Sequence, residues 1–471
     1  MTSSTARPMV TEPTAAGTRG YPFGLTLVDL GAHGYRANEY FLEGEAIRYR
    51  PAAGTELGRD GRWVAEPSGT APYRTRVIVY RPVDPDRFNG TVVLHWNNVS
   101  AGYDLFSGDT PEILEGGYAF AGVTTQRVGV HGLPGAPQGL RAWDPERYAT
   151  LSITSDDDSF DIFTQAARAV GSDRDRATDP LDGLDVARVV AMGSSQSAGR
   201  LATYVNAVHP LTRAIDGFLL LIYFGSGTPL EVGDEVVNIV NPTQPFDARA
   251  ALQGRNYIRD DLDVPVMVVN SELEAIACYP VRQPDTERFR YWETAGTCHV
   301  SQQAMDLRAP KYERDFGTPL PTPASVNHIS MIPLYDAGLH HLQQWLTTGT
   351  GPPAQPLIDF AGDPPEVVRD EHGIARGGIR LPQVEVPIAQ NSAIPVADDI
   401  FSVLYGSSVP FPAAKLRALY GDAATFVARF EEAAHAAEKV GVLLPRDVGA
   451  LTDEAQASFP DLATTTGVDV D

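Results

Sequence analysis

The most informative segment of this chain is Val189-Val190-Ala191-Met192-Gly193-Ser194-Ser195-Gln196-Ser197-Ala198-Gly199-Arg200-Leu201. Residues 186–192 are mostly apolar and predict a buried strand, and residues 197–208 predict a helix directly after it. The Gly-x-Ser-x-Ser turn between them has small residues, which let strand and helix backbones approach closely. A strand that passes through such a turn into a helix is typical of a nucleophile elbow. The pattern puts Ser195 at the apex, with Ser194 and Ser197 as alternative hydroxyls.

The rest of the chain alternates strands with helices. Besides the two elements at the elbow, we expect strands at residues 40–49, 73–81, 91–95, 118–125, 217–224, 264–270 and 288–292, and helices at residues 159–170 and 334–346. The second of these strands, residues 73–81, alternates polar and apolar residues and suits a partly exposed antiparallel edge. Strands that alternate with helices predict an α/β fold, with a mostly parallel sheet covered by helices on both faces.

Two long stretches interrupt this alternation, and the two ends of the chain differ from it. Residues 225–263 and 300–333 are candidate caps over an active site, because each is too long for a plain connection. Residues 1–20 are rich in Thr, Ser, Ala and Pro and predict a disordered tail. Residues 353–471 predict a C-terminal extension packed on the core, which leaves residues 21–352 as that core.

The charge balance and the apolar runs exclude several classes of protein. The chain of 471 residues has 37 basic and 60 acidic side chains, a net charge of −23. A nucleic-acid surface needs clustered basic side chains, so we expect no such partner. The longest apolar run, residues 218–224, is far shorter than the roughly 20 residues that span a bilayer. Residues 1–20 lack the apolar segment of a signal peptide, so we expect a cytoplasmic protein without membrane contact.

The sequence offers little to hold a metal or a nucleotide. Cys278 and Cys298 are the only cysteines, which excludes a disulfide framework and a Cys-rich zinc site. A single bridge between them is an alternative to two free thiols. His340 and His341 are adjacent on a predicted helix and cannot face one metal from one side. No Gly-x-x-x-x-Gly-Lys-Ser/Thr motif appears, so we expect no cofactor and no metal.

A nucleophilic serine needs an acid and a base, which follow it in the order Ser, acid, His in a sheet of this kind. The predicted strand at residues 264–270 leads into Ser271-Glu272-Leu273-Glu274. Glu274 lies where the chain has turned past the strand end, so we choose it as the acid. Glu272 is the alternative.

Among the histidines, His299 has the most suitable position for the base. It lies in the loop after the predicted strand at residues 288–292, 25 residues beyond Glu274. A loop histidine at this edge of the sheet can accept the serine proton while a carboxylate fixes its tautomer. His328 is the second choice. His95 is positioned to line the pocket, but it precedes the serine, which is the wrong order for the base.

Two backbone N–H groups are expected to hold a developing oxyanion. The first is that of Gln196, at the start of the predicted helix. The second should come from the loop after residues 91–95, where we expect the N–H of Asn97 or, failing that, of Asn98. Trp96 in the same loop is expected to pack against the elbow, with a pocket wall as the alternative.

Several segments together resemble the bacterial α/β-hydrolase-domain family of esterase-like proteins. The matching segments are residues 89–102, 144–151, 160–166, 195–197, 290–299, 377–382 and 443–447. The resemblance covers nearly everything after residue 20, including the predicted extension. It implies an α/β-hydrolase fold with Ser195 as nucleophile and His299 as base, and it says little about the substrate.

The chain departs from the pattern of this family at three positions. The family has Ser-Glu-x-Asp where this chain has Ser271-Glu272-Leu273-Glu274. The longer side chain keeps a carboxylate at position 274 but leaves the acid open between Glu272 and Glu274. The family also tends to have a small residue in place of Cys298 and an apolar one in place of Asn97, and neither change removes a backbone donor.

These residues predict a serine carboxylic-ester hydrolase, either an esterase or a lactonase. Ser195 attacks the carbonyl, His299 takes its proton, and Glu274 orients the imidazole. Aromatic and aliphatic residues in the two candidate caps favour a bulky hydrophobic ester or lactone as the small-molecule substrate. The alternatives are an acyltransferase or amidase with the same residues, or a non-catalytic binding protein of this fold. A homo-oligomer is compatible with the sequence.

Overall fold

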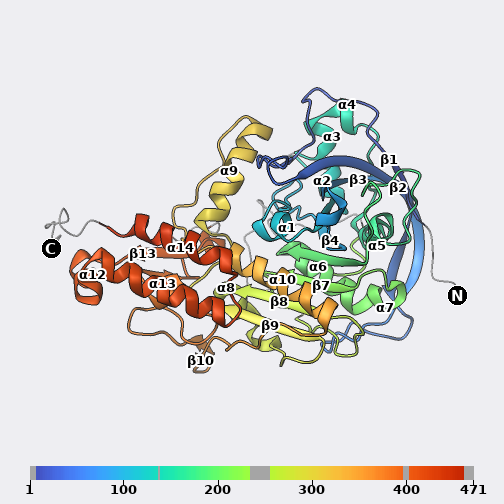
Figure 1. Ribbon diagram of the computed structural model, residues 1–471. Coiled ribbons are helices and arrows are strands. Elements are labelled where there is room, and N and C mark those ends of the chain that lie inside the picture. Colours follow the sequence, from blue (N-terminus) through green and yellow to red (C-terminus); the bar gives the residue numbers. More distant parts are fainter. Residues whose placement is uncertain (1–6, 136–137, 234–254, 396–401, 461–471) are drawn as a thin grey trace.

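A computed structural model describes residues 7–135, 138–233, 255–395 and 402–460 (Figure 1). A nine-stranded sheet runs through them in the order β1-β2-β3-β5-β4-β6-β7-β8-β9. Three strands pair antiparallel: β1 (Met9–Thr11), β2 (Tyr35–Pro51) and β3 (Ala65–Pro82). Six are parallel: β4 (Thr91–Trp96), β5 (Ala119–Val123), β6 (Arg188–Ser194), β7 (Gly217–Leu221), β8 (Val266–Ser271) and β9 (Phe289–Thr294). The predicted mostly parallel sheet is confirmed.

The antiparallel edge of the sheet is larger than the sequence suggests. β2 and β3 pair along their whole lengths, from Tyr35 opposite Pro82 to Pro51 opposite Ala65. The ends of β2 and β3 contain partly exposed polar residues, so a search for apolar residues in the sequence does not detect them as strand. β1 pairs with the middle of β2, so the expected disordered tail is wrong for residues 9–11, while residues 1–6 lie outside the described residues.

Helices cover both faces of the sheet. α5 (Ser159–Val170) and α6 (Gln196–Thr203) pack on one face, and α1 (Pro111–Glu115) and α10 (Ile332–Thr348) pack on the other. Side chains along β4 alternate between these two layers, because successive residues of a strand point to opposite faces. A strand buried on both faces reads as a continuous apolar run, which is why this part of the sheet is visible in the sequence.

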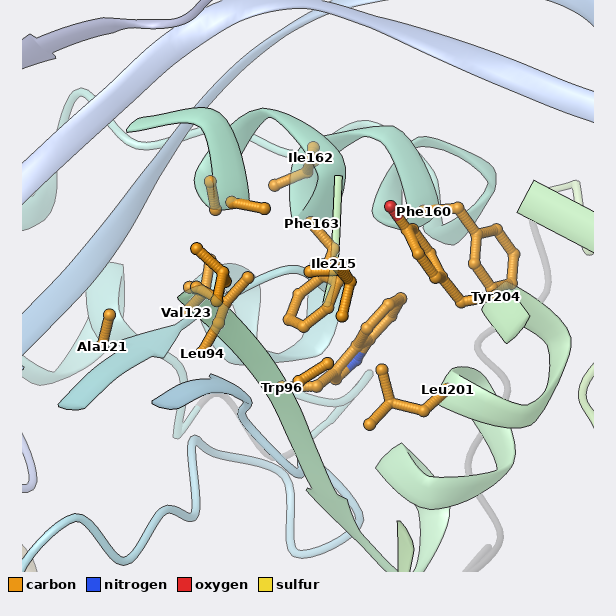
Figure 2. Packing of buried hydrophobic residues seen from close by; sticks show 14 of the residues in the cluster. Leu94, Trp96, Ala121, Val123, Phe160, Ile162, Phe163, Leu201, Tyr204 and Ile215 are labelled. Atoms are coloured by element: carbon orange, nitrogen blue, oxygen red, sulfur yellow. The ribbon is translucent and has the colours of Figure 1, made fainter. Parts of the chain in front are cut away.

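Trp96 belongs to the core rather than to a pocket wall. Its indole is fully buried among the helix α5 residues Phe160 and Phe163, with a ring-centroid distance of 4.8 Å to Phe163 (Figure 2). The indole N–H donates to the side-chain oxygen of Gln126 (3.1 Å), which also accepts from the Gln196 amide (2.9 Å). The expectation that Trp96 packs in the interior, rather than forming a pocket wall, is therefore confirmed.

The remaining elements are short segments around the sheet and a group near the C-terminus. The first group is α2 (Arg127–His131), α3 (Leu140–Trp143), α4 (Pro145–Tyr148), α7 (His209–Thr212), α8 (Glu272–Cys278) and α9 (Gln302–Phe316). The second is β10 (Phe360–Ala361), β11 (Glu366–Val367), α11 (Pro382–Glu385), β12 (Ala389–Ser392), β13 (Ser407–Pro410), α12 (Ala413–Tyr420), α13 (Ala423–Lys439) and α14 (Pro445–Ser458). A π-helical turn, Tyr204–Val208, continues α6.

The C-terminal helices contact the helices on one face of the sheet. Figure 1 shows α12, α13 and α14 grouped on one side of the molecule, close to α10. Arg446 at the start of α14 forms an ion pair with Glu112 of α1 (2.7 Å), and Glu112 also contacts His340 of α10 (3.1 Å). Within the described ranges, no helix is long and apolar enough to cross a membrane.

Candidate active site

Ser195 lies in a strained turn at the carboxyl end of β6, immediately before α6. Its backbone has φ 60° and ψ −119°, a conformation that costs a non-glycine residue of the order of 1–3 kcal/mol. The Ser195 N–H donates to the carbonyl of Leu221 at the end of β7 (2.9 Å), which holds the turn against the sheet. This is the strand–turn–helix geometry that the sequence predicts for a nucleophile elbow.

One glycine allows the strand and the helix to meet at this turn, and a second allows the segment after β7 to approach α6. A Cβ on Gly193 would lie 2.9 Å from a methyl carbon of Leu201 and 3.0 Å from the Ser197 carbonyl oxygen. A Cβ on Gly199 would lie 3.2 Å from the Ser226 carbonyl oxygen. Both contacts are tighter than a side chain accommodates without a shift. The sharp turn therefore depends on Gly193, and the approach of Ser226 to α6 depends on Gly199.

The Ser197 hydroxyl, one of the alternative nucleophiles, has a structural use in the turn. It accepts a hydrogen bond from the Ser194 N–H (3.0 Å) and donates to the Ser194 carbonyl (2.8 Å). The Ser197 side chain is fully buried. A hydroxyl that closes two local hydrogen bonds away from solvent is poorly placed to attack a substrate. Ser194, the other alternative, is the last residue of β6 and lines the cavity beside Ser195.

Glu274 and His299 form a buried pair at the carboxyl edge of the sheet. The imidazole Nδ1 lies 2.7 Å from Glu274 Oε1, and the carboxyl group is fully buried. A carboxylate only accepts hydrogen bonds, so in a neutral ring Nδ1 carries the proton and Nε2 is left as the acceptor. The ring also stacks on Phe224, with centroids 5.1 Å apart. These contacts fix both the tautomer and the ring orientation that a general base needs.

Glu274 lies in a helix, not in a loop as expected. It is the third residue of α8, where its Oε2 accepts from the N–H of Ser271 (3.2 Å) while the Ser271 hydroxyl caps the helix. This reciprocal arrangement is a capping box, for which the sequence Ser-x-x-Glu is typical. The longer side chain of glutamate therefore serves two partners, the helix start and His299.

Glu272, the alternative acid, braces the backbone of the histidine loop. Its Oε2 accepts from the Gly296 N–H (2.8 Å), and its Oε1 contacts the guanidinium of Arg369 (2.8 Å). Burial raises the pKa of the Glu272 carboxyl, and the charge of Arg369 opposes that shift. The Asn327 side chain holds the next peptide group of this loop by donating to the Gly296 carbonyl (2.8 Å).

The other histidines are placed away from this role. His328, the second choice for the base, is exposed, and its backbone N–H donates to the Ser408 hydroxyl (2.9 Å). His341 contacts the Gly441 carbonyl through Nε2 (2.7 Å). His95 lies on the cavity wall, where burial lowers its pKa to about 4. It is therefore neutral at pH 7 and contacts the side-chain oxygen of Asn97 (3.1 Å).

The first predicted oxyanion donor is free, whereas the second is not. In the described part of the chain, the Gln196 N–H at the start of α6 has no hydrogen-bond acceptor. The Asn97 N–H, in contrast, donates to the Val123 carbonyl (3.1 Å), which extends the β4–β5 pairing by one residue. The Asn98 N–H donates to the Leu105 carbonyl (3.0 Å). The prediction of a backbone donor at Asn97, or at Asn98, is therefore wrong.

A large, mostly apolar cavity contains the candidate residues. It has a volume of about 2390 Å³, and Ser195, Gln196 and His299 all line it. Its wall also includes residues of α9 and of the start of α10, such as Leu307 and Tyr335. Part of the expected cap at residues 225–263 contributes through residues 226–229 and 255, while residues 234–254 lie outside the described residues.

Both cysteines are buried free thiols, so the alternative of a bridge between them is wrong. The Cys278 thiol donates to the Tyr223 carbonyl (3.0 Å), and the Cys298 thiol donates to the Val300 carbonyl (3.2 Å). No group of three or more His, Cys, Asp or Glu side chains suited to a metal occurs among the residues that the structure describes.

Comparison with solved structures finds hydrolases at low identity. The esterase Est22 structure is 12% identical with a TM-score of 0.26, over 52% of this chain and 65% of that chain. Brefeldin A esterase, a bacterial homologue of human hormone-sensitive lipase, is 13% identical with a TM-score of 0.23, over 50% and 63%. Oligopeptidase B from Leishmania major is 12% identical with a TM-score of 0.28, over 56% and 33%. The matched part spans less than two thirds of each of these three chains.

Comparison with curated proteins gives no match. A family model described as alpha/beta hydrolase domain matches residues 10–453, which is nearly the whole chain and includes the segments after α10. The strand order, the strained serine turn and the acid–histidine pair agree with that match. The chain belongs to the α/β hydrolase domain family.

Proposed function

We propose that this protein is a serine hydrolase of carboxylic esters, including lactones, with Ser195, His299 and Glu274 as its catalytic triad. The observation that carries the proposal is the buried Glu274–His299 pair (2.7 Å), whose histidine lines the same cavity as the strained Ser195. Ser195 attacks the substrate carbonyl, and His299 Nε2 takes its proton and returns it to the leaving alcohol. Water then hydrolyses the acyl-enzyme. The Gln196 N–H donates to the oxyanion.

The cavity supports a bulky hydrophobic substrate. Ligand pockets commonly have volumes of about 300–1,000 Å³, and the cavity of about 2390 Å³ here is larger and mostly apolar. Burial of an acyl chain or a macrocycle against such walls contributes roughly 25 cal/mol per Å² of apolar surface. We therefore propose long-chain esters or large lactones as the substrate class, in preference to acetates.

The test is hydrolysis of p-nitrophenyl esters of increasing acyl length and of lactones of increasing ring size. The wild type should turn over, with kcat/KM rising with acyl length or ring size. Ser195→Ala should lower kcat at least about a thousandfold, as expected for loss of a triad nucleophile. Ser197→Ala is the matched control, because it removes a neighbouring hydroxyl with a structural use, and its kcat should fall far less.

Two outcomes would overturn the proposal. Equal activity of the wild type and Ser195→Ala would show that Ser195 is not the nucleophile. Inactivity of the wild type on the whole panel, together with no labelling by an alkyl fluorophosphonate, would favour a binding protein. Alcohol acceptors added at increasing concentration separate hydrolysis from acyl transfer, because a transferase would form the new ester at the expense of the free acid.

A further inference from the structure

We propose that the side-chain amide of Asn98 is the second hydrogen-bond donor to the oxyanion, together with the N–H of Gln196. This inference rests on the proposed function, because it concerns the same reaction at Ser195. It assigns a side-chain donor where the sequence pattern led us to expect a backbone one.

The backbone of the loop after β4 is engaged elsewhere. The N–H groups of Asn97 and Asn98 donate to the carbonyls of Val123 and Leu105 (3.1 and 3.0 Å). The Asn97 side chain is fully buried and points to other partners, with its Nδ2 donating to Asp104 (3.3 Å). A loop held in this way must offer a different group to the cavity.

The Asn98 side chain is fixed in one orientation beside the elbow. Its Oδ1 accepts from both the N–H (2.8 Å) and the hydroxyl of Ser100, and its Nδ2 donates to the Ser194 carbonyl (2.9 Å). The reverse orientation would set Nδ2 against the Ser100 N–H and Oδ1 against a carbonyl oxygen, so the neighbours settle which atom is nitrogen. Nδ2 therefore lies next to the residue that precedes Ser195.

One hydrogen of this amide is left for a ligand. Nδ2 carries two hydrogens, and the Ser194 carbonyl takes one of them; within the described ranges the other has no acceptor. Asn98 lines the cavity together with Ser195 and Gln196 and is 8% exposed, so its amide is sheltered yet reachable. A pre-oriented donor in a sheltered site stabilises a developing oxyanion more than it stabilises the neutral carbonyl of the bound ester.

The test compares Asn98→Ala and Asn98→Asp with the wild type on the best ester of the panel. Asn98→Ala should lower kcat about 100- to 1000-fold, with KM within about threefold, because the lost hydrogen bond forms mainly in the transition state. Asn98→Asp should lose at least as much, since a carboxylate repels the oxyanion. An alkyl boronic acid that forms a tetrahedral adduct with serine should lose affinity in proportion to kcat/KM.

Asn206→Ala is a matched control for the loss of a buried asparagine. Its Nδ2 donates to the Tyr257 carbonyl (2.8 Å) and its Oδ1 accepts from the Arg259 N–H (3.0 Å), so the same kinds of bond disappear, but Asn206 does not line the cavity. Asn206→Ala should lower the melting temperature and leave kcat within about threefold of the wild type.

The outcomes separate this inference from the proposed function. If Ser195→Ala is inactive but Asn98→Ala keeps kcat within tenfold, the inference alone is overturned, and the N–H groups of Val99 and Ala101 become the candidates. If Asn98→Ala loses activity but binds the boronic acid as tightly as the wild type, the role of Asn98 is structural and the inference fails. If Ser195→Ala remains active, the proposed function fails first.

Discussion

Replacing each of the two buried carboxylates, Glu274 and Glu272, by glutamine tests which of them is the acid of the proposed triad and which only holds the histidine loop. The sequence leaves this assignment open, and the structure gives the two side chains different partners. Glu274 contacts the imidazole of His299 (2.7 Å), while Glu272 contacts Gly296 and Arg369. The two variants differ from the wild type by one isosteric change each, only two positions apart, so they control for one another.

Glu274→Gln should lower kcat by about four orders of magnitude with little change in KM. In the transition state the imidazolium and the carboxylate form an ion pair with charge centres about 4 Å apart. At an effective dielectric constant of about 20 this is worth about 4 kcal/mol, or roughly a thousandfold in rate. The glutamine amide also donates to Nδ1 and imposes the wrong tautomer, which brings the loss towards about 10⁴.

Glu272→Gln should keep kcat within about tenfold of the wild type. The glutamine oxygen still accepts from the Gly296 N–H, so the histidine loop keeps its position. Burial raises the pKa of Glu272 although Arg369 lies beside it, which means that the ionised form carries a desolvation cost. Removing one partner of a buried ion pair commonly costs about 3–5 kcal/mol. The side chain of Arg369 is 24% exposed and also donates to the Gly373 carbonyl (3.1 Å), so the loss of unfolding free energy should lie below that range.

Steady-state kinetics on the preferred p-nitrophenyl ester and urea unfolding measure the two effects. Glu274→Asp adds a further comparison, because it keeps the charge and should retain more activity than Glu274→Gln. The reasoning is refuted if Glu272→Gln loses activity a thousandfold while Glu274→Gln stays within tenfold. It is also refuted if both variants lose activity equally and remain folded.

Three further predictions concern stability. Ser195→Gly should be more stable than Ser195→Ala by about 1 kcal/mol in urea unfolding. Glycine relieves the backbone strain at φ 60°, and this gain exceeds the cost of the greater entropy of glycine in the unfolded chain. A less stable Gly variant would contradict this. Burial raises the pKa of Asp336 to about 7, so the contribution of Asp336 to the stability of the wild type falls as pH rises from about 4 to 7. Asp336→Asn should then gain up to about 4 kcal/mol at pH 8 and nothing near pH 4, and an equal gain at both would refute it. Trp96→Ala should lose about 3–5 kcal/mol of unfolding free energy, since the indole is fully buried; a loss below 1 kcal/mol would contradict that packing.

Features encoded by short stretches of sequence were predictable. The buried strand before Ser195, the small residues at the turn and the helix after it are local, and the structure confirms them. The helix predicted at residues 159–170 is observed with the same bounds. The capping-box motif Ser271-x-x-Glu274 is also present in the sequence, and it predicts that Glu274 lies in a helix rather than in a loop.

The second oxyanion donor that we propose, the Asn98 amide, was not predictable from the sequence, because the bonds that decide it involve partners remote in the chain. Whether the Asn97 N–H is free is decided by the Val123 carbonyl, which only the β4–β5 pairing brings near. The orientation of the Asn98 amide is decided by Ser100 and by the Ser194 carbonyl, 96 residues away. A sequence pattern does not show how distant segments pair with one another. It therefore identifies the loop after β4 but not which N–H group in that loop is free to bind an oxyanion.

The histidine loop shows why the predicted extension matters to the site although its sequence carries no catalytic motif. Arg369 reaches Glu272 across 97 residues, and the Leu404 carbonyl accepts from the Val300 N–H (2.9 Å), one residue after His299. Three contacts thus hold the peptide planes around His299: Glu272 and Asn327 at Gly296, and the Leu404 carbonyl at Val300. One of these contacts, that of Leu404, comes from beyond position 353, and Arg369 of the same region holds the Glu272 carboxylate that makes another. A loop histidine must keep its ring orientation to accept a proton at Nε2, and the C-terminal residues supply part of that rigidity. If Ser195, Glu274 and His299 act as we propose, these C-terminal residues help to hold the base, although all three proposed catalytic residues precede them.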